Sequence, residues 1–221
     1  MRWLWVVFFG LLATGAQAAS FDCAKAATEI EHAICSSPVL SQLDEDMAAA
    51  YKQVPQSNKY FASLRANQRD WLQNDRIADV QTFENRAMYL TAFASLATCL
   101  DASDTPQDCL TAERETLDTC MNAGQYSTYA MNTCSGAMAA AWDTILAVES
   151  GLQRQSLADD PETLDLYDAA LAAFDAYRDA ECGWRYSQYR DGTIRGQIWF
   201  GCYLDLTSRR VFATILDHQL F

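Results

Sequence analysis

The chain contains eight cysteines, all between residues 23 and 202. An even number of cysteines in an exported chain is typical of a disulfide framework, whose cross-links restrict the folds that the chain can adopt. Zinc binding is the alternative use of several cysteines, but it needs closely spaced ligands such as C-x-x-C. No C-x-x-C pair occurs, and the only histidines are His32 and His218. We therefore predict disulfides, with no reactive thiol and no metal site.

The N-terminal residues predict export. A positive start, Met1-Arg2, precedes an apolar run over residues 3–12, and Ala-Gln-Ala at 16–18 matches a small-x-small cleavage site. This arrangement is typical of a secretory signal peptide, which we assign to residues 1–19. The alternative is an uncleaved anchor, but the run is short for a membrane span. We expect a periplasmic or secreted protein with no membrane span after cleavage.

Apolar residues recur at spacings of three and four along most of the chain, which predicts helices. The helical ranges are 38–55, 60–76, 77–98, 134–152, 162–182 and a last helix after Gly196. In that last helix we place five residues toward the core: Ile198, Cys202, Leu206, Ala213 and Leu216. No segment alternates with turn signals, so we expect no sheet. The predicted fold is all-α, with two small disulfide-stapled antiparallel helical bundles in tandem.

The segment 101–108 interrupts this helical pattern. It contains Pro106, three aspartates and no large apolar residue, which is typical of a boundary. We therefore assign residues 20–100 to a first helical module, 101–119 to a linker and 120–221 to a second module.

Short loops suggest two of the disulfides. Cys23 and Cys35 flank one short helical stretch. Cys99 and Cys109 flank the polar loop DASDTPQD. Local closure of each loop is the simplest arrangement, so we predict the pairs Cys23–Cys35 and Cys99–Cys109.

The other four cysteines are assigned from the geometry of paired helices. In an antiparallel pair, Cys182 at the end of one helix meets the start of its partner, near Cys120. Cys134 and Cys202 each lie about two turns into a helix, so at about 1.5 Å per residue they reach a similar depth. We therefore favour Cys120–Cys182 and Cys134–Cys202, and the crossed arrangement of these cysteines stays open.

The charge distribution indicates a class of partner. The formal net charge is −13, which argues against nucleic acid as a ligand. Residues 143–181 hold ten acidic residues and two arginines, whereas residues 185–210 hold five arginines and two aspartates. An acidic face attracts cationic proteins, although charged helix surfaces also serve solubility alone. The carboxylates that we select for partner binding are Asp159, Asp160, Glu162, Asp165 and Asp168.

Sparse motifs around the cysteines occur in both halves of the chain. In the first half they are Phe21-Asp22-Cys23-Ala24-Lys25-Ala26, Glu31, Ile34-Cys35, Leu43-Asp44, Tyr51, Gln68-Arg69, Trp71-Leu72 and Arg76. In the second half they are Met131-Asn132, Cys134, Tyr177-Arg178-Asp179-Ala180-Glu181-Cys182, Gly192-Thr193-Ile194, Cys202, Leu206-Thr207 and Arg210. Each set resembles the LprI-type lysozyme-inhibitor domain, so the chain looks like two tandem copies. The resemblance implies an exported helical module and, by the family name, inhibition of a lysozyme.

The two sets also depart from the family pattern. No cysteine follows soon after Arg76, where members often have one. Phe174 stands where a tryptophan is usual, and Asp191 stands where a glycine is usual. Cys99 and Cys109 would then belong to a linker rather than to the first copy.

The residues offer no pattern that indicates catalysis. His32 lies beside two glutamates on a short helix, and His218 lies close to the C-terminus. Paired carboxylates cluster at helix starts, where they complement the helix dipole instead of flanking a substrate. We therefore expect neither an enzyme nor a cofactor.

Four aromatic residues gather around the loop after Cys182, namely Trp184, Tyr186, Tyr189 and Trp199. We expect them to cap a small core, and a groove for small molecules or glycans is the alternative. The leading functional hypothesis is a protein-binding module that inhibits a basic lysozyme through the acidic helical face. A structural or adaptor protein of the cell envelope, without lysozyme binding, is the alternative.

Overall fold

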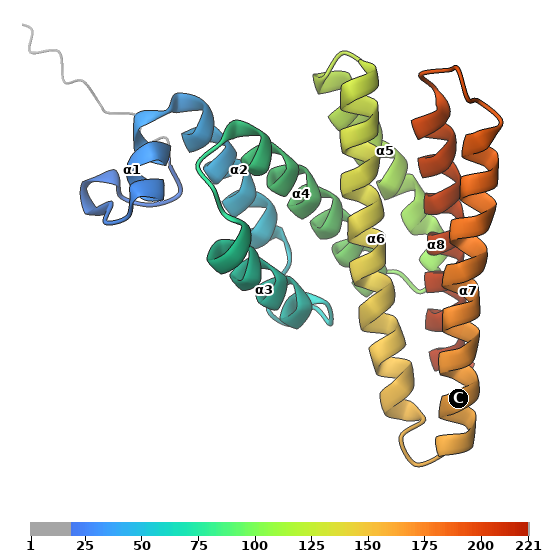
Figure 1. The fold of residues 1–221 in the computed structure, drawn as a ribbon. Coiled ribbons are helices and arrows are strands. Elements are labelled where there is room, and N and C mark those ends of the chain that lie inside the picture. Colours follow the sequence, from blue (N-terminus) through green and yellow to red (C-terminus); the bar gives the residue numbers. More distant parts are fainter. Residues whose placement is uncertain (1–18, 221) are drawn as a thin grey trace, which may run out of the picture.

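The computed structural model describes residues 19–220, so nearly all of the predicted signal peptide lies outside the described residues. The described part contains eight α-helices and no β-strand, which confirms the predicted all-α class (Figure 1). The helices are α1 (Glu29–Ser36), α2 (Pro38–Gln53), α3 (Phe61–Asp70), α4 (Val80–Ala102), α5 (Cys109–Ala123), α6 (Thr128–Ser156), α7 (Pro161–Ser187) and α8 (Arg195–Leu220). Short 3-10 turns occur at Cys23–Lys25 and Pro106–Asp108, and a π-helical turn, Trp71–Asp75, extends α3.

Side chains at the helix starts explain where several helices begin. Ser37 precedes Pro38, and its hydroxyl accepts a hydrogen bond from the backbone N–H of Leu40 at 3.4 Å. Thr28 and Glu31 form a capping box at the start of α1. Each such cap satisfies backbone donors that have no partner within the helix, and contributes typically about 1 kcal/mol.

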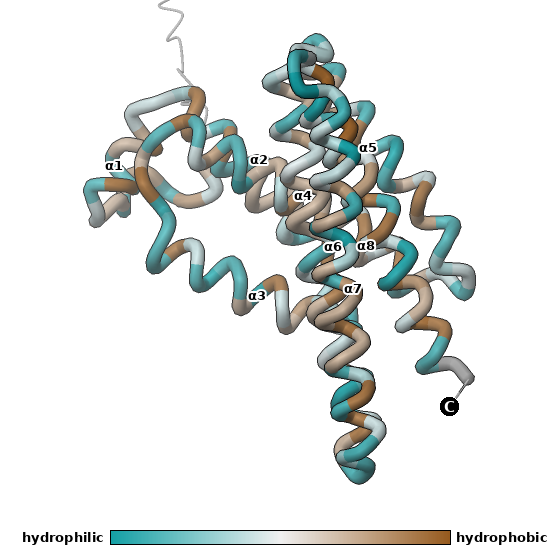
Figure 2. Tube along the Cα trace, turned by 45° about the vertical axis from the view of Figure 1, so that its right-hand side comes forward, coloured by the Kyte–Doolittle hydropathy of each residue, from teal (hydrophilic) through white to brown (hydrophobic). Residues whose placement is uncertain are grey.

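The long helices form two groups that lie side by side (Figure 1). The first group is α2, α3 and α4, and the second is α6, α7 and α8; in each, the middle helix runs opposite to the other two. Because α4 packs directly against α6, both groups contribute to one hydrophobic core. The core includes Leu90, Phe93, Leu96, Trp142, Ile145 and Val211. The turn between α6 and α7 extends beyond the ends of the other helices (Figure 2).

The segment predicted as a linker, 101–119, contains most of α5. This helix packs against both α4 and α6. Glu113 of α5 is buried, and its carboxylate accepts a hydrogen bond from the indole Nε1 of Trp142 at 2.6 Å. The module boundaries stay a prediction, but the segment between them belongs to the packed core.

The structure confirms the two local disulfides and corrects the other two. Cys23–Cys35 and Cys99–Cys109 are both present, each with 5.7 Å between Cα atoms. The remaining pairs are Cys120–Cys134 and Cys182–Cys202, so the predicted Cys120–Cys182 and Cys134–Cys202 pairs are wrong.

The reason is that Cys120 lies on a helix of its own. It belongs to α5, and a tight turn after Ala123 leads into α6, so Cys120 faces Cys134 across this turn. Cys182 lies near the end of α7 and Cys202 lies near the start of α8, at similar distances from the loop that joins them. Both disulfides therefore connect helices that are neighbours in the chain.

The inward face of α8 also differs from the prediction. Ala213 and Leu216 are exposed, whereas Val211, Phe212 and Ile215 are buried. The buried stripe passes through small hydroxyl residues, because Thr207, Ser208 and Thr214 are almost fully buried. These polar residues interrupt the apolar spacing along α8. The prediction therefore assigned the wrong residues to the side of α8 that faces the core.

We expect digestion of the oxidised protein without reduction to yield peptides joined by Cys120–Cys134 and Cys182–Cys202. Replacing Cys182 and Cys202 together by serine should lower the free energy of unfolding by about 3 kcal/mol, since their disulfide closes a loop of 20 residues. Mass spectrometry and urea denaturation measure the two outcomes. Linked peptides that contain Cys120 and Cys182 would contradict this arrangement.

Candidate functional site

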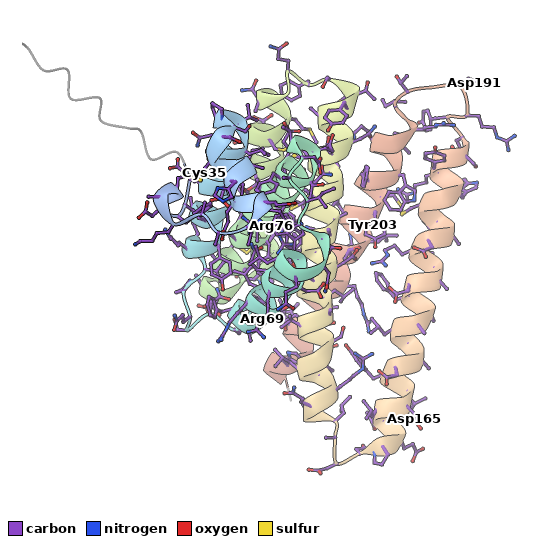
Figure 3. All side chains as sticks on the ribbon, turned by 60° about the vertical axis from the view of Figure 1, so that its left-hand side comes forward. Cys35, Arg69, Arg76, Asp165, Asp191 and Tyr203 are labelled. Atoms are coloured by element: carbon purple, nitrogen blue, oxygen red, sulfur yellow. A yellow bond between two sulfur atoms is a disulfide. The ribbon has the colours of Figure 1, made fainter. Side chains whose placement is uncertain are left out.

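The five carboxylates selected for partner binding lie around the turn between α6 and α7, and we call this group the acidic end. Its members are Asp159, Asp160, Glu162, Asp165 and Asp168, and all five are exposed. Figure 3 shows Asp165 near the end of the hairpin, far from the loop that contains Asp191. The structure therefore brings these residues together on the part of the hairpin that projects from the protein.

Two members of the acidic end have local partners. Asp160 caps α7, because its carboxylate accepts from the Thr163 hydroxyl at 2.7 Å and from the Thr163 backbone N–H at 3.1 Å. These hydrogen bonds lower the pKa of Asp160 below its usual range. Asp168 accepts from Arg154 Nε at 2.7 Å, which joins α7 to α6. Asp159, Glu162 and Asp165 are exposed and have no such side-chain partner among the described residues.

Two other carboxylates of the hairpin are paired with neighbouring side chains. Glu149 is fully buried and lies 2.9 Å from Lys59 Nζ. Asp143 accepts from the Tyr203 hydroxyl at 2.9 Å, and burial raises the pKa of Asp143. The count of ten acidic residues in 143–181 therefore overstates the negative surface, which is concentrated at the acidic end.

The family motif Tyr177–Cys182 contains the buried Arg178, which holds three helices together. From α7, its Nη1 donates to Asp143 of α6 at 3.3 Å and to the Thr207 hydroxyl of α8 at 3.1 Å. Its guanidinium also lies over the Tyr203 ring, 4.1 Å from the ring centroid. The motif that resembles the family most closely thus contributes a structural link between three helices.

The first copy contains a similar link. Arg76 Nη2 lies 3.8 Å from Asp44, and Asp44 follows Cys35 by nine residues, as Asp143 follows Cys134. Arg76 follows Trp71 by five residues, whereas Arg178 follows Phe174 by four. A π-helical turn accommodates one extra residue, and the chain has one at Trp71–Asp75. The two copies therefore share a disulfide followed by an aspartate–arginine pair.

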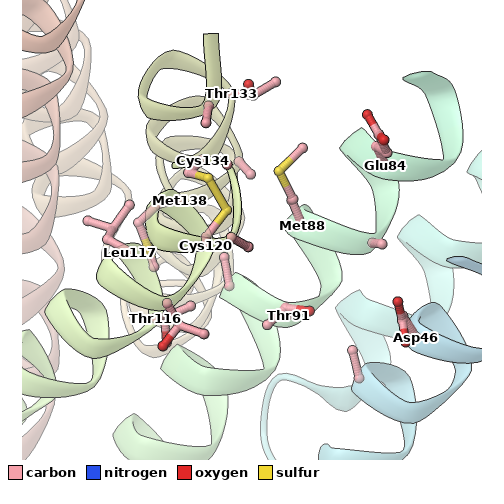
Figure 4. A pocket seen from close by; sticks show the side chains of 18 of the residues that line it. Asp46, Glu84, Met88, Thr91, Thr116, Leu117, Cys120, Thr133, Cys134 and Met138 are labelled. Atoms are coloured by element: carbon pink, nitrogen blue, oxygen red, sulfur yellow. A yellow bond between two sulfur atoms is a disulfide. The ribbon is translucent and has the colours of Figure 1, made fainter. Parts of the chain in front are cut away.

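A groove of about 810 Å³ lies among α2, α4, α5 and α6 (Figure 4). Met88, Met138 and the Cys120–Cys134 disulfide line its apolar part. Asp46, Glu84 and Glu115 also line it, and its lining includes no lysine or arginine. No local sequence pattern indicates this groove, because its walls come from four separate helices, one of them in the predicted linker.

The four aromatic residues around the loop after Cys182 differ in their burial. Trp184, Tyr186 and Tyr189 are exposed, so the expectation that they cap a core is wrong for these three. Trp199 stacks on Tyr203 with 4.7 Å between ring centroids. Only Trp199 therefore joins the packed part of the protein.

The two histidines lie in different surroundings. His32 is exposed on α1, whereas His218 Nδ1 lies 3.5 Å from the buried Glu149. Over residues 19–220, no group of three or more His, Cys, Asp or Glu side chains is placed to hold a metal ion. Within the same range, no helix has the length and apolar character needed to cross a membrane.

The profile of the family described as "Lysozyme inhibitor LprI" matches residues 23–105 and 120–213. The chain belongs to the LprI family. The two matched ranges confirm the tandem copies inferred from the motifs. No curated protein and no solved structure matched the chain. Membership of the LprI family and the four disulfides together indicate an extracytoplasmic location.

Glu149 binds Lys59 and accepts a hydrogen bond from the Tyr60 hydroxyl, and we call these three residues the Glu149 cluster. The cluster joins the two LprI copies, since Lys59 and Tyr60 belong to the first copy and Glu149 to the second. Glu149→Ala should lower the free energy of unfolding by about 3 kcal/mol, because it removes the buried acceptor of both residues. Glu149→Gln should lower the free energy of unfolding by less, since the amide oxygen of glutamine can still accept the hydrogen bond from Tyr60.

Urea denaturation at neutral pH measures both changes. The exposed Glu115→Ala is the control, and we expect it to alter the free energy of unfolding by less than about 0.5 kcal/mol. A Glu149→Ala variant as stable as this control would show that the cluster does not hold the copies together.

Proposed function

We propose that the protein inhibits a lysozyme by docking the acidic end of the α6–α7 hairpin over the cleft of the enzyme. The observation that carries this proposal is the LprI match over both copies of the chain. Animal-type lysozymes are strongly basic enzymes. An acidic surface attracts such an enzyme and accelerates the encounter between the two proteins.

The shape of the hairpin supports this use of its acidic end. The end is narrow, since it consists of two helix ends and one turn, and it projects from the rest of the protein (Figure 2). The Asp160 cap orders the start of α7, and the exposed Arg154–Asp168 pair adds a contact between α6 and α7 beside the turn. A preordered binding element loses less entropy on binding than a mobile loop does.

The four disulfides are consistent with an inhibitor that acts outside the cytoplasm. Four disulfides persist only in an oxidising environment, such as the bacterial periplasm or the extracellular medium. We therefore place the activity in the periplasm or outside the cell, where lysozymes meet the cell wall.

Charge reversal at the acidic end tests the proposal. In the triple variant Asp159→Lys, Glu162→Lys and Asp165→Lys, we expect inhibition of a basic animal-type lysozyme to weaken at least about tenfold. The remaining inhibition should depend less on salt, because fewer charges attract the enzyme. Asp160 is left unchanged because it caps α7. Inhibition is measured at low and at moderate salt.

A second triple variant provides a control with the same change in net charge. Asp46→Lys, Glu84→Lys and Glu115→Lys alter the groove and leave the hairpin intact. At moderate salt, we expect this variant to inhibit within about twofold of the unmodified protein, because distant charges are screened. If the groove variant loses inhibition and the hairpin variant keeps it, the docking surface is the groove.

The groove favours a second candidate function, an adaptor role in the cell envelope. Its apolar lining and its carboxylates would suit a partner segment that carries both apolar and basic side chains. No inhibition by a large excess of oxidised, folded protein would reject the tested lysozyme as the target. The adaptor role would then become the leading hypothesis.

A further inference from the structure

Exposed aromatic and aliphatic side chains gather at the end of the molecule opposite to the acidic end. The loop between α7 and α8 and the turn between α5 and α6 lie at the same end of the second helix group (Figures 1 and 3). The exposed side chains are Tyr126, Tyr129, Trp184, Tyr186, Tyr189 and Ile194. Trp184 is 59% exposed and Ile194 is 53% exposed, so neither is part of a core. Large apolar side chains grouped in this way indicate an interaction surface.

Arginines lie among the aromatic side chains of the α7–α8 loop, although the chain as a whole is acidic. Residues 184–195 contain Arg185, Arg190 and Arg195 and one acidic residue, Asp191. Arg185 pairs with Glu181 at 2.8 Å. Arg190 and Arg195 donate to backbone carbonyls, and Arg195 also lies over the Tyr186 ring. Arg190 and Arg195 are exposed, so their positive charges lie at the surface near the aromatic rings.

Helix electrostatics account for only part of this pattern. Basic residues at the C-terminus of α7 complement the helix dipole, as acidic residues do at its N-terminus. The dipole gives no reason for exposed tryptophan, tyrosine and isoleucine at the same place. A ligand that combines negative charge with an apolar phase accounts for both kinds of side chain.

We propose that this end, which we call the aromatic–arginine end, docks on an anionic phospholipid surface. Tryptophan and tyrosine side chains favour the headgroup level of a bilayer, where a polar edge and an apolar ring are both accommodated. Arginine forms strong hydrogen bonds with phosphate groups, and basic residues are attracted to anionic lipids. The end is formed by a loop and a turn at the ends of long helices (Figure 1), so it can meet an extended lipid surface.

The direction of α7 gives the docked protein a defined orientation. This helix has 27 residues, which corresponds to a length of about 40 Å. Docking through the aromatic–arginine end directs the acidic end away from the negatively charged lipid. The proposal needs no lysozyme binding, so it stands or fails independently of the function proposed above.

Vesicle binding of the oxidised protein tests this surface. We expect the protein to sediment with vesicles of phosphatidylcholine and phosphatidylglycerol, with at least about tenfold weaker binding to phosphatidylcholine alone. Raising the salt concentration should weaken binding to the anionic vesicles. Trp71 and Trp142 are buried and Trp199 is partly buried, so Trp184 is the exposed reporter in the described chain. Brominated lipids in the anionic vesicles should therefore quench Trp184 fluorescence.

Two double variants separate the charged from the aromatic contribution. Arg190→Glu with Arg195→Glu, and Trp184→Ala with Tyr189→Ala, should each weaken binding to the anionic vesicles at least about tenfold. The matched controls are Arg65→Glu with Arg209→Glu and Leu72→Ala with Ile77→Ala, which change exposed residues elsewhere. These controls should bind within about twofold of the unmodified protein.

Three results would overturn the proposal. The first is equal binding to anionic and neutral vesicles, and the second is no loss of binding in either double variant. The third is binding to insoluble peptidoglycan with none to vesicles, which would assign the end to glycans. Circular dichroism confirms that each variant is folded, which is expected because the altered side chains are exposed.

Discussion

A buried guanidinium orders the second half of the molecule. Arg178 of α7 bonds to Asp143 of α6 and to Thr207 of α8, and it also packs on an aromatic ring of α8. Because Asp143 is itself partly exposed, this contact is weaker than a fully buried ion pair, but it joins three helices through one side chain. With the helices held in this register, α7 carries the acidic end at its start and the aromatic–arginine end at its finish.

Much of the fold follows from local sequence patterns. Spacings of three and four predicted the long helices, and the predicted range 38–55 begins where α2 begins. The errors concern the buried face of α8 and the pairing of four cysteines. Polar residues on the buried face of α8 concealed its register, and Cys120 was placed at the wrong helix. The internal repeat held the missing information, since the local pair Cys23–Cys35 of the first copy implies a local Cys120–Cys134 pair in the second.

The candidate sites likewise include features that local sequence predicts and features that depend on the tertiary fold. Sequence alone located the acidic end, because exposed charges around a helix turn need no knowledge of the tertiary fold. It gave no means of separating the capping Asp160 and the paired Asp168 from the unpaired charges beside them. The groove was beyond prediction because four helices build it, and the burial of Glu149 depends on Lys59 and Tyr60 of the other copy.

The length of α7 also determines how its two ends influence each other. At physiological ionic strength the Debye length is about 8 Å, whereas the helix extends over about 40 Å. Charges at one end are therefore almost fully screened from charges at the other. A negatively charged surface held at one end leaves the electrostatic potential at the opposite end nearly unchanged, so the helix serves as an insulating spacer between two chemically opposite surfaces.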